Sequence, residues 1–271
     1  MAVPDLSATP LQDLYSLTGR VAVVTGAGRG VGAGCARRLA EAGASVAVCD
    51  IDPTTIETTV KEIESEGGRA LGVVMDVSDA AAIQQGVERI LAELGQIDIL
   101  VNNAGIFPPC PFLDENDEHW GRVLGVNLDG VMRCSQSVAR HLVARGAPGV
   151  IVNISSIEGE KPGTAGAGAY VTSKASVTGL TKALAIELGP LGIRVLAVAP
   201  TLVNTPGVQE LMPMMEAAGI GNLIEALRVK VPLGRAAVPD DVARAVTFAA
   251  SDMSMLMTGS TLYVDAGAMT V

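Results

Sequence analysis

The sequence has 271 residues, 49% of them hydrophobic, which is enough for one large domain or two small ones around a sizeable core. The formal net charge of −10 repels a polyphosphate backbone and argues against nucleic acid as a partner. The chain has no apolar run near the roughly 18 residues of a membrane span and no secretory signal, so we expect a cytoplasmic protein with no membrane partner.

The cysteines and histidines show neither Cys-x-x-Cys spacing nor a metal-ligand pattern. We therefore predict no disulfide framework, no bound metal and thiols that stay reduced. The residues concerned are Cys35, Cys49, Cys110, Cys134, His119 and His141.

Residues 1–18 are expected to form an N-terminal arm, and residues 19–271 a single domain. The domain starts with a β-branched apolar run at 21–25, a glycine loop at 26–32 and an amphipathic stretch to Ala42. Strand, glycine loop and helix form the start of a dinucleotide-binding unit, because the helix N-terminus and the close backbone suit a pyrophosphate. A plain strand-to-helix turn is the alternative interpretation.

The second strand, 45–50, ends on Asp50, about 20 residues beyond the loop, where such a unit places an acid for the adenosine ribose. Asp50 would accept a hydrogen bond from a 2′-hydroxyl and repel a 2′-phosphate, and Ile51 offers no compensating charge. This predicts NAD as the cofactor, although Arg29 in the loop could assist a 2′-phosphate. Asp50 could instead cap the next helix, but Asp52 before Pro53 fits that role better.

Strands and helices then alternate to the end of the chain. The pattern predicts strands at 70–77, 97–102, 150–154, 194–199 and 261–264, and helices at 80–94, 115–144, 170–188 and 239–250. Such alternation is typical of an α/β fold with a parallel sheet covered on both faces.

Tyr170 and Lys174 are four residues apart in a predicted helix and therefore share a face. An ammonium near a phenol favours the phenolate and should lower the pKa of the tyrosine. A hydroxyl from Ser155 or Ser156, just after a strand, could hold a substrate oxygen while the tyrosine moves its proton. Tyr-x-x-x-Lys alone also arises by chance in many helices.

The combined motifs resemble the short-chain dehydrogenase/reductase family over residues 17–269. They are Thr25-Gly26-x-x-x-Gly30-x-Gly32, Asn102-Asn103-Ala104-Gly105, Asn127, Ser156 and Tyr170-x-x-x-Lys174. The resemblance implies a doubly wound Rossmann-type sheet of about seven strands and a homotetramer. It also implies hydride transfer between a nicotinamide ring and a carbonyl or alcohol.

The resemblance assigns four catalytic positions. Tyr170 would be the general acid in reduction and the base in oxidation, Lys174 would lower its pKa and hold the nicotinamide ribose, and Ser156 would hold the substrate oxygen. Asn127 would kink its helix and support a water beside Lys174, unless it merely satisfies a helix end. Ser155 remains the alternative to Ser156.

The cofactor positions implied by the resemblance and by the glycine loop lie at the ends of successive strands. They are Gly26, Arg29, Gly30, Val31, Gly32, Asp50, Ile51, Asp76, Val77, Asn103, Ala104, Gly105, Tyr170, Lys174, Pro200, Val203 and Thr205. Asp76 could alternatively cap the following helix.

Three features depart from the family pattern, the first being Leu196 in place of the asparagine that is usual in its strand. The Gly/Ala-rich link from Ser156 to Tyr170 is one residue longer than the common form. Thr201 replaces the glycine that usually follows Pro200, so we expect φ below zero at Thr201.

The segment from about 205 to 230 would be a substrate lid. Its apolar residues are Leu211, Met212, Met214, Met215, Ile220, Leu223, Ile224 and Leu227. Because methionine adapts to irregular apolar shapes, they suggest an apolar or cyclic substrate, unless they only pack the lid onto the core or a neighbouring subunit. Further candidate pocket residues are Phe107, Pro108, Pro109 and Glu158.

The sequence thus predicts an NAD-dependent short-chain alcohol dehydrogenase/ketone reductase acting on a small secondary alcohol or ketone. A 3-oxoacyl carrier-protein reductase is an alternative, although the sequence shows no basic patch for an acidic carrier protein. A non-catalytic cofactor-sensing protein is a third possibility, and the complete set of four catalytic positions argues against it.

Overall fold

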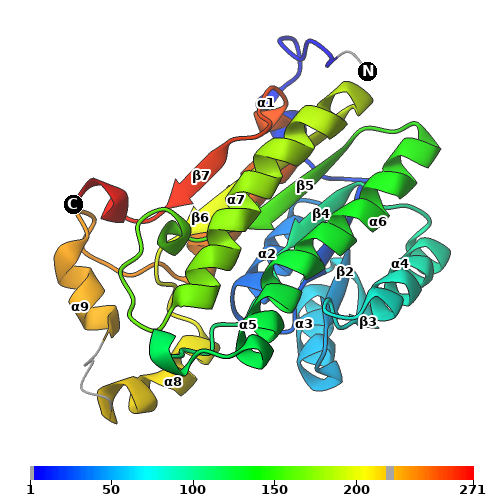
Figure 1. Cartoon of the computed structure of the whole chain (residues 1–271). Helices are drawn as coiled ribbons and strands as arrows, with labels where there is room; N and C mark the ends of the chain where they lie inside the picture. The colour runs from blue at the N-terminus through cyan, green and yellow to red at the C-terminus, as the bar shows by residue number, and fades with distance from the viewer. Residues whose placement is uncertain (1–2, 218–222) are drawn as a thin grey trace.

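The computed structural model describes residues 3–217 and 223–271, except for the side chains of 211, 213–217, 223 and 226–228. It confirms the predicted parallel sheet, with strand order β3-β2-β1-β4-β5-β6-β7 (Figure 1). The strands are β1 (Val21–Thr25), β2 (Ser45–Asp50), β3 (Arg69–Val74), β4 (Ile99–Asn102), β5 (Gly149–Ile154), β6 (Ile193–Pro200) and β7 (Thr261–Val264).

Helices cover both faces of the sheet, as expected for a doubly wound fold (Figure 1). They are α1 (Leu11–Tyr15), α2 (Gly30–Glu41), α3 (Pro53–Ser65), α4 (Ala80–Leu94), α5 (Asp117–Leu124), α6 (Gly130–Arg145), α7 (Gly168–Leu188), α8 (Pro206–Ala217), α9 (Leu223–Lys230) and α10 (Pro239–Ala250). A π-helical turn, η2 (Gly125–Asp129), joins α5 to α6, so the predicted helix 115–144 is nearly continuous.

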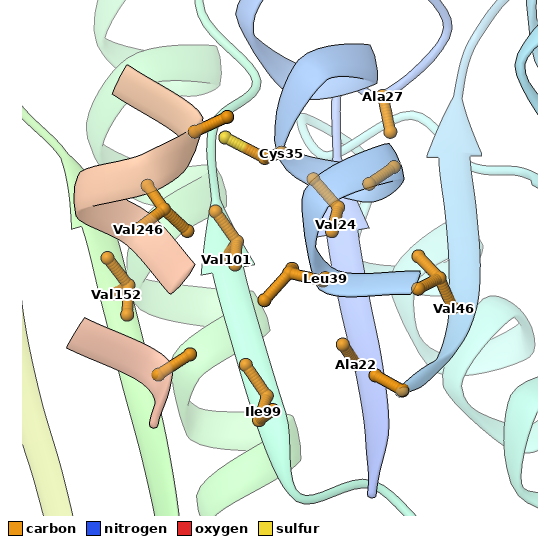
Figure 2. Close-up of a cluster of buried hydrophobic side chains, with 14 of the residues drawn as sticks. Ala22, Val24, Ala27, Cys35, Leu39, Val46, Ile99, Val101, Val152 and Val246 are labelled. Atoms are coloured by element: carbon orange, nitrogen blue, oxygen red, sulfur yellow. The ribbon is translucent and has the colours of Figure 1, made fainter. Parts of the chain in front are cut away.

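The core consists of two layers because alternate residues of each buried strand point to opposite faces. On one face Val24 and Val101 pack with Leu39 of α2 and Val246 of α10, as Figure 2 shows. On the other face the strands pack against α4, α6 and α7. Full burial of a side chain such as Leu39 contributes about 1.5–3 kcal/mol to folding, which explains why these apolar runs specify strands and helices so clearly.

Two strands, β3 and β4, are shorter than predicted. β3 lies at the sheet edge and pairs only with β2, whose last residue, Asp50, lies opposite Val74. β4 starts at Ile99, opposite Ala22 of β1. The amide of the preceding residue, Asp98, donates to the Val21 carbonyl, and its side chain accepts a hydrogen bond from the Val21 amide.

The amino-terminal segment contributes few side chains to the core. Helix α1 buries none of its residues, whereas Leu17 is fully buried among the side chains under α2.

All four cysteines are unbridged; only Cys110 is not buried. Within the described parts of the chain, none of the helices combines the length and the apolarity needed to cross a bilayer.

Candidate active site

A cavity of about 1310 Å³ opens at the carboxyl ends of the central strands. The strand order reverses between β1 and β4, and open α/β sheets bind ligands in the crevice beside such a reversal. The predicted site residues that line this cavity are Gly26, Arg29, Gly30, Val31, Asp50, Ile51, Asp76, Val77, Asn103, Ala104, Gly105, Ser156, Tyr170, Lys174, Pro200, Val203 and Thr205. Gly32 and Asn127 do not line it.

The glycine loop between β1 and α2 has the conformation that its sequence suggested. Gly26 and Gly30 have φ of +61° and +62°, values that favour glycine. Gly32 supports the loop from behind, because a Cβ added there would lie 2.1 Å from the carbonyl oxygen of Gly26. The backbone therefore forms an open cradle at a helix N-terminus, which suits a pyrophosphate.

Asp50 ends β2 at the rim of this cradle and is already engaged with the backbone. Its Oδ2 accepts a hydrogen bond from the Gly28 amide at 2.9 Å, and its Oδ1 accepts one from the Ile51 amide at 2.7 Å. Asp52 caps α3 by accepting from the Thr54 amide, as the sequence predicted. Asp50 is thus held at the cavity wall and is not used as a helix cap.

Arg29 extends from the glycine loop toward α8. Its guanidinium forms an ion pair with Glu210 at 2.7 Å, and both side chains are more than half exposed. This contact joins the predicted cofactor loop to the predicted lid. The cation that could have assisted a 2′-phosphate is therefore paired with a carboxylate.

Asp76 and Val77 lie in the loop after β3. The Oδ1 atom of Asp76 accepts hydrogen bonds from the amide and hydroxyl of Ser78, while Asp79 caps α4 by accepting from the Ala81 amide. Asp76 is therefore not the cap of the next helix. Its exposed carboxylate lies at the cavity wall.

Asn103 connects the end of β4 to the glycine loop. Its side-chain amide donates to the carbonyls of Thr25 and Gly26, at 3.0 and 2.9 Å. The Thr25 hydroxyl in turn accepts from the amides of Asn103 and Ala104. These bonds hold Ala104 against the glycine loop, where a Cβ added to Gly26 would lie 2.8 Å from the Ala104 Cα.

Asn127 is fully buried inside the π-helical turn. Its side chain exchanges two hydrogen bonds with the backbone of Ile106 and donates a third to the Ser173 hydroxyl. The π-helical turn interrupts the regular α-helix at Asn127, whose amide connects this turn to the loop after β4 and to α7. Its location among these buried groups accounts for its absence from the cavity wall.

The two serines after β5 have different surroundings. The Ser155 hydroxyl donates to the Lys174 carbonyl and also hydrogen-bonds the Thr178 hydroxyl, each at 2.9 Å. The Ser156 hydroxyl accepts from the Glu158 amide at 3.2 Å and interacts with the Tyr170 phenol. Ser156 is the one whose oxygen meets the tyrosine.

Tyr170 and Lys174 lie one turn apart on α7, and the lysine Nζ is 5.7 Å from the tyrosine ring centre. Lys174 is buried and donates to the Ile154 carbonyl at 2.8 Å. Burial lowers the pKa of Lys174 to about 8. The ring of Phe107 meets Tyr170 edge-on, with centroids 4.8 Å apart.

The predicted lowering of the tyrosine pKa is wrong for this structure. Burial raises the pKa of Tyr170, the interaction with Ser156 lowers it, and the carboxylate of Glu158 raises it. The net pKa lies above the ordinary value because removing a phenolate from water outweighs the favourable contact. Lys174, buried beside it, faces the same cost for its own charge.

Glu158 anchors the long link between Ser156 and Tyr170. Its carboxylate accepts from the amides of Gly163 and Thr164 and from the Thr164 hydroxyl. The side chain therefore lies along the cavity wall and does not point to water. Phe107 and Pro108 also line the cavity, whereas the exposed Pro109 does not.

The far wall comes from the segment after β6. The φ of Thr201 is not positive, as we expected for a residue that replaces the usual glycine after Pro200. Val203 forms an isolated bridge with Ala237, and Thr205 lies beside Gly30 of the glycine loop. Helix α8 begins at once and lies at the end of the molecule opposite the N-terminus (Figure 1).

The predicted lid therefore contains α8 and α9. Its cavity-lining residues are Thr205, Gly207, Val208, Glu210 and Lys230. Met212 and Ile224 are partly buried. The remaining apolar side chains of the prediction lie outside the described residues: Leu211, Met214, Met215, Ile220, Leu223 and Leu227.

The family described as enoyl-(acyl carrier protein) reductase matches residues 26–269, nearly all of this domain. Short-chain reductase NovJ of Streptomyces niveus is 42% identical over 91% of this chain and 93% of its own. The chain belongs to the short-chain dehydrogenase/reductase family. It is also 41% identical to cis-4-hydroxycyclohexanecarboxylate dehydrogenase of Sinomonas cyclohexanicum, over 92% of this chain and 96% of that one.

Solved structures agree with this membership. Gluconate 5-dehydrogenase of Burkholderia cenocepacia, in complex with NADP and tartrate, superimposes with a TM-score of 0.87 and 34% identity, covering 97% of this chain and all of that chain. The 3-ketoacyl-(acyl-carrier-protein) reductase of Brucella melitensis, complexed with NADH, gives a TM-score of 0.83 and 37% identity over 93% and 99%. As a short-chain dehydrogenase/reductase, the protein is an oxidoreductase.

Sequence reasoning missed part of the scaffold of this short-chain dehydrogenase/reductase site. Asn102 of β4 donates to Asn153 of β5 and to Ser135 of α6, and Asn153 donates to Thr181 of α7. This buried network fixes both strands that deliver site residues. The sequence signal that could have revealed this network is an asparagine near the end of each of two predicted buried strands, Asn102 and Asn153. A buried amide needs a hydrogen-bond partner.

Proposed function

We propose that this protein is an NAD-dependent alcohol dehydrogenase/ketone reductase that acts on a secondary alcohol or ketone. The observation that carries the proposal is that Ser156, Tyr170 and Lys174 line the same cavity as the glycine loop, with the Tyr170 ring beside Lys174 and its phenol beside Ser156. Asn127 holds this part of the cavity wall from behind. A nicotinamide dinucleotide bound in the cradle supplies or accepts the hydride.

In reduction, the Ser156 hydroxyl donates a hydrogen bond to the substrate oxygen and Tyr170 transfers its phenolic proton to the same oxygen. In oxidation, the Tyr170 phenolate removes that proton. Lys174, in the second turn of α7, supplies a donor for the ribose, and the fixed position of these groups lowers the barrier by orientation and electrostatics. The raised pKa keeps the Tyr170 phenol protonated at neutral pH, which is the form that reduction requires.

The choice of NAD over NADP is supported by Asp50 and Arg29. The Asp50 carboxylate is fixed at the cavity wall by the amides of Gly28 and Ile51, so a 2′-phosphate there would meet a like charge. Arg29, the cation of the glycine loop, is paired with Glu210. Activity with each cofactor, measured side by side, tests this choice directly.

An apolar or cyclic substrate is supported by the lining near Tyr170, where the side chains of Ile106, Phe107, Pro108 and Ile157 border the cavity. We expect a cyclic ketone to be reduced with a higher kcat/KM than a short aliphatic or a charged ketone. Preference for the charged ketone would contradict the apolar-pocket proposal, and turnover only with NADP would contradict the cofactor proposal.

A second candidate is a 3-oxoacyl carrier-protein reductase, which is the activity named for the Brucella melitensis structure. One observation favours it: the exposed cationic residues Arg122 and Lys230 both line the cavity and could meet an acidic partner. Adding a 3-oxoacyl thioester on a pantetheine arm to the panel separates the two. Tight NAD binding without turnover of any substrate would instead favour a cofactor-sensing protein.

The proposal also includes a homotetramer. Exposed apolar side chains that a neighbouring subunit could cover occur on α7 and near the carboxyl terminus, where Ile186 is 78% and Leu256 89% exposed. Light scattering coupled to size exclusion gives the mass of the assembly, and a monomer would contradict this part.

A further inference from the structure

A side-chain cluster outside the catalytic machinery has the composition of a transition-metal site. Cys110, Glu115 and His119 place one sulfur, one oxygen and one nitrogen atom within 4.8 Å of one another. These residues do not form a known ligand motif in the sequence. Cys110 lies in a loop, Glu115 precedes the N-cap of α5, and His119 lies in the first turn of α5. All three are partly buried.

The histidine contacts restrict which atom carries a proton. Nε2 of His119 lies 3.0 Å from the carbonyl oxygen of Pro108, and a carbonyl can only accept, so Nε2 bears the hydrogen. Nδ1 lies 2.5 Å from Oε1 of Glu115. A neutral imidazole would therefore point its lone pair at a carboxylate, an arrangement that needs a positive charge between the two atoms.

That positive charge can be a proton or a metal ion, and the surroundings favour an ion. Metal-bound histidines usually donate their second ring nitrogen to a carbonyl or carboxylate, which is what Nε2 does here. The thiol of Cys110 is the third donor. Asp114, Asp117 and Glu118 add carboxylates in the same stretch of chain and make the local potential attractive to a cation.

We propose that Cys110, Glu115 and His119 bind a zinc-like divalent ion, with water as the fourth ligand. A sulfur, imidazole and carboxylate set selects zinc over magnesium or calcium, which prefer oxygen alone. Tetrahedral zinc holds its ligand atoms roughly 3.3–3.6 Å apart, so binding requires side-chain movements of only about 1 Å. Cys110 binds as the thiolate and releases its proton to water.

The location gives the ion a role in shaping the substrate pocket. His119 is bonded to Pro108, which lines the cavity, and the neighbouring Phe107 packs on the Tyr170 ring. The Cys110 amide donates to the Gly166 carbonyl in the link before α7. A bound ion would therefore connect the loop after β4, which carries Phe107 and Cys110, more firmly to α5 and to the link before α7.

Cobalt is the most direct probe, because a thiolate–cobalt bond gives a near-ultraviolet charge-transfer band and tetrahedral cobalt gives visible bands. The full-length protein is freed of metal with a chelator and titrated with Co²⁺, and zinc is then added as competitor. We expect one equivalent of Co²⁺ to bind with both sets of bands and to be displaced by zinc. The absence of a charge-transfer band would overturn the proposal.

Variants assign the ligands. Cys110→Ser should abolish the charge-transfer band, and Glu115→Gln or His119→Gln should weaken cobalt binding at least about 100-fold. Glu118→Gln is the matched control, because it removes the same charge from the same turn of chain and should bind normally. Equal losses for Glu115→Gln and Glu118→Gln would mean that only general negative charge attracts the ion, and the site would be rejected.

Thermal unfolding provides a readout that does not depend on enzyme activity. Zinc at about 100 times its Kd should raise the Tm of the wild-type protein by roughly 5 °C and should not raise that of Cys110→Ser. An equal shift in both proteins would contradict coordination by Cys110.

Discussion

The Nζ atom of Lys174 lies 5.7 Å from the ring centre of Tyr170 and donates its hydrogen bond to a backbone carbonyl, not to the phenol. The lysine therefore packs beside the phenol ring without a hydrogen bond to its hydroxyl. Tyr170→Phe leaves this arrangement and the edge contact with Phe107 in place, because both involve the ring and not the hydroxyl.

We predict that Tyr170→Phe lowers kcat about 100- to 10,000-fold, the usual range for loss of a general acid–base group. Its Tm should stay close to that of the wild type, because only one hydroxyl is removed. Steady-state kinetics of ketone reduction measures the loss. Near-normal turnover would rule out Tyr170 as the proton donor.

Lys174 should make the stability of the protein depend on pH. Its pKa is about 8 in the folded protein against an ordinary 10.5, so between these values the unfolded chain holds a proton that the folded chain has released. Stability from this group therefore rises with pH across the window, and the cost of the buried charge is fully present below pH 8.

Comparison with Lys174→Met isolates that contribution. From pH 8 to pH 10.5 the wild type should gain up to about 3 kcal/mol relative to the variant, since one pKa unit corresponds to about 1.4 kcal/mol. Denaturant unfolding at several pH values measures the difference. Parallel curves for the two proteins would show that the ammonium is not desolvated.

Asp50 should set cofactor preference through its charge. Asp50→Asn keeps an acceptor for the Gly28 amide but removes the repulsion toward a 2′-phosphate. We expect the ratio of kcat/KM for NAD over NADP to fall at least about 10-fold, equivalent to about 1.4 kcal/mol. Glu210→Gln, which frees Arg29, tests the alternative: a larger fall there would assign preference to the loop cation.

Glu158 should affect the pH at which the tyrosine works. Its carboxylate is one of the groups that raise the pKa of Tyr170, so Glu158→Gln should lower that pKa. In alcohol oxidation, where the phenolate is the base, the rising limb of kcat/KM should then move to lower pH. Glu160→Gln is the control, because Glu160 is bonded to Tyr263 instead. Coincident profiles for wild type and Glu158→Gln would contradict the electrostatic effect.

Two glycines should respond to alanine in opposite directions. At Gly32 the new methyl would lie 2.1 Å from the Gly26 oxygen and 2.5 Å from the Asn103 amide nitrogen, so we expect a destabilisation of about 1–3 kcal/mol. At Gly179, inside α7, no neighbour lies within 4 Å, so alanine should stabilise by about 0.5–1 kcal/mol. Denaturant midpoints give both values; equal effects would contradict the close approach at Gly32.

The fold was predictable where local pattern and tertiary environment agree. The run Val21–Thr25 is apolar at its first four positions and is buried at every position, and Asp52 before Pro53 caps α3 as its sequence suggested. The limits of β3 were not predictable, because they depend on where β2 ends. A strand stops when its partner stops, and this is information from another part of the chain.

In the candidate site, too, local sequence predicted some features, whereas others depend on distant parts of the chain. The spacing of Tyr170 and Lys174 predicted a shared helix face, but the balance between burial and charge that fixes the pKa of Tyr170 needed three dimensions. The exchange of bonds between Asn127 and Ile106 links residues 21 positions apart, and no local pattern encodes it. The Cys110, Glu115 and His119 cluster stayed hidden because its spacing matches no ligand motif.

The π-helical turn at 125–129 has a consequence for how this chain tolerates change in length. A π turn contains one residue more than an α-helical turn of the same span, and it is this surplus that sets the rotation between α5 and α6. Deleting one residue there would relax the turn to regular α-helix and swing Asn127 away from Ile106. Substitutions on the outer face of α6 leave that register intact, so in this part of the chain residue number is more tightly constrained than residue identity.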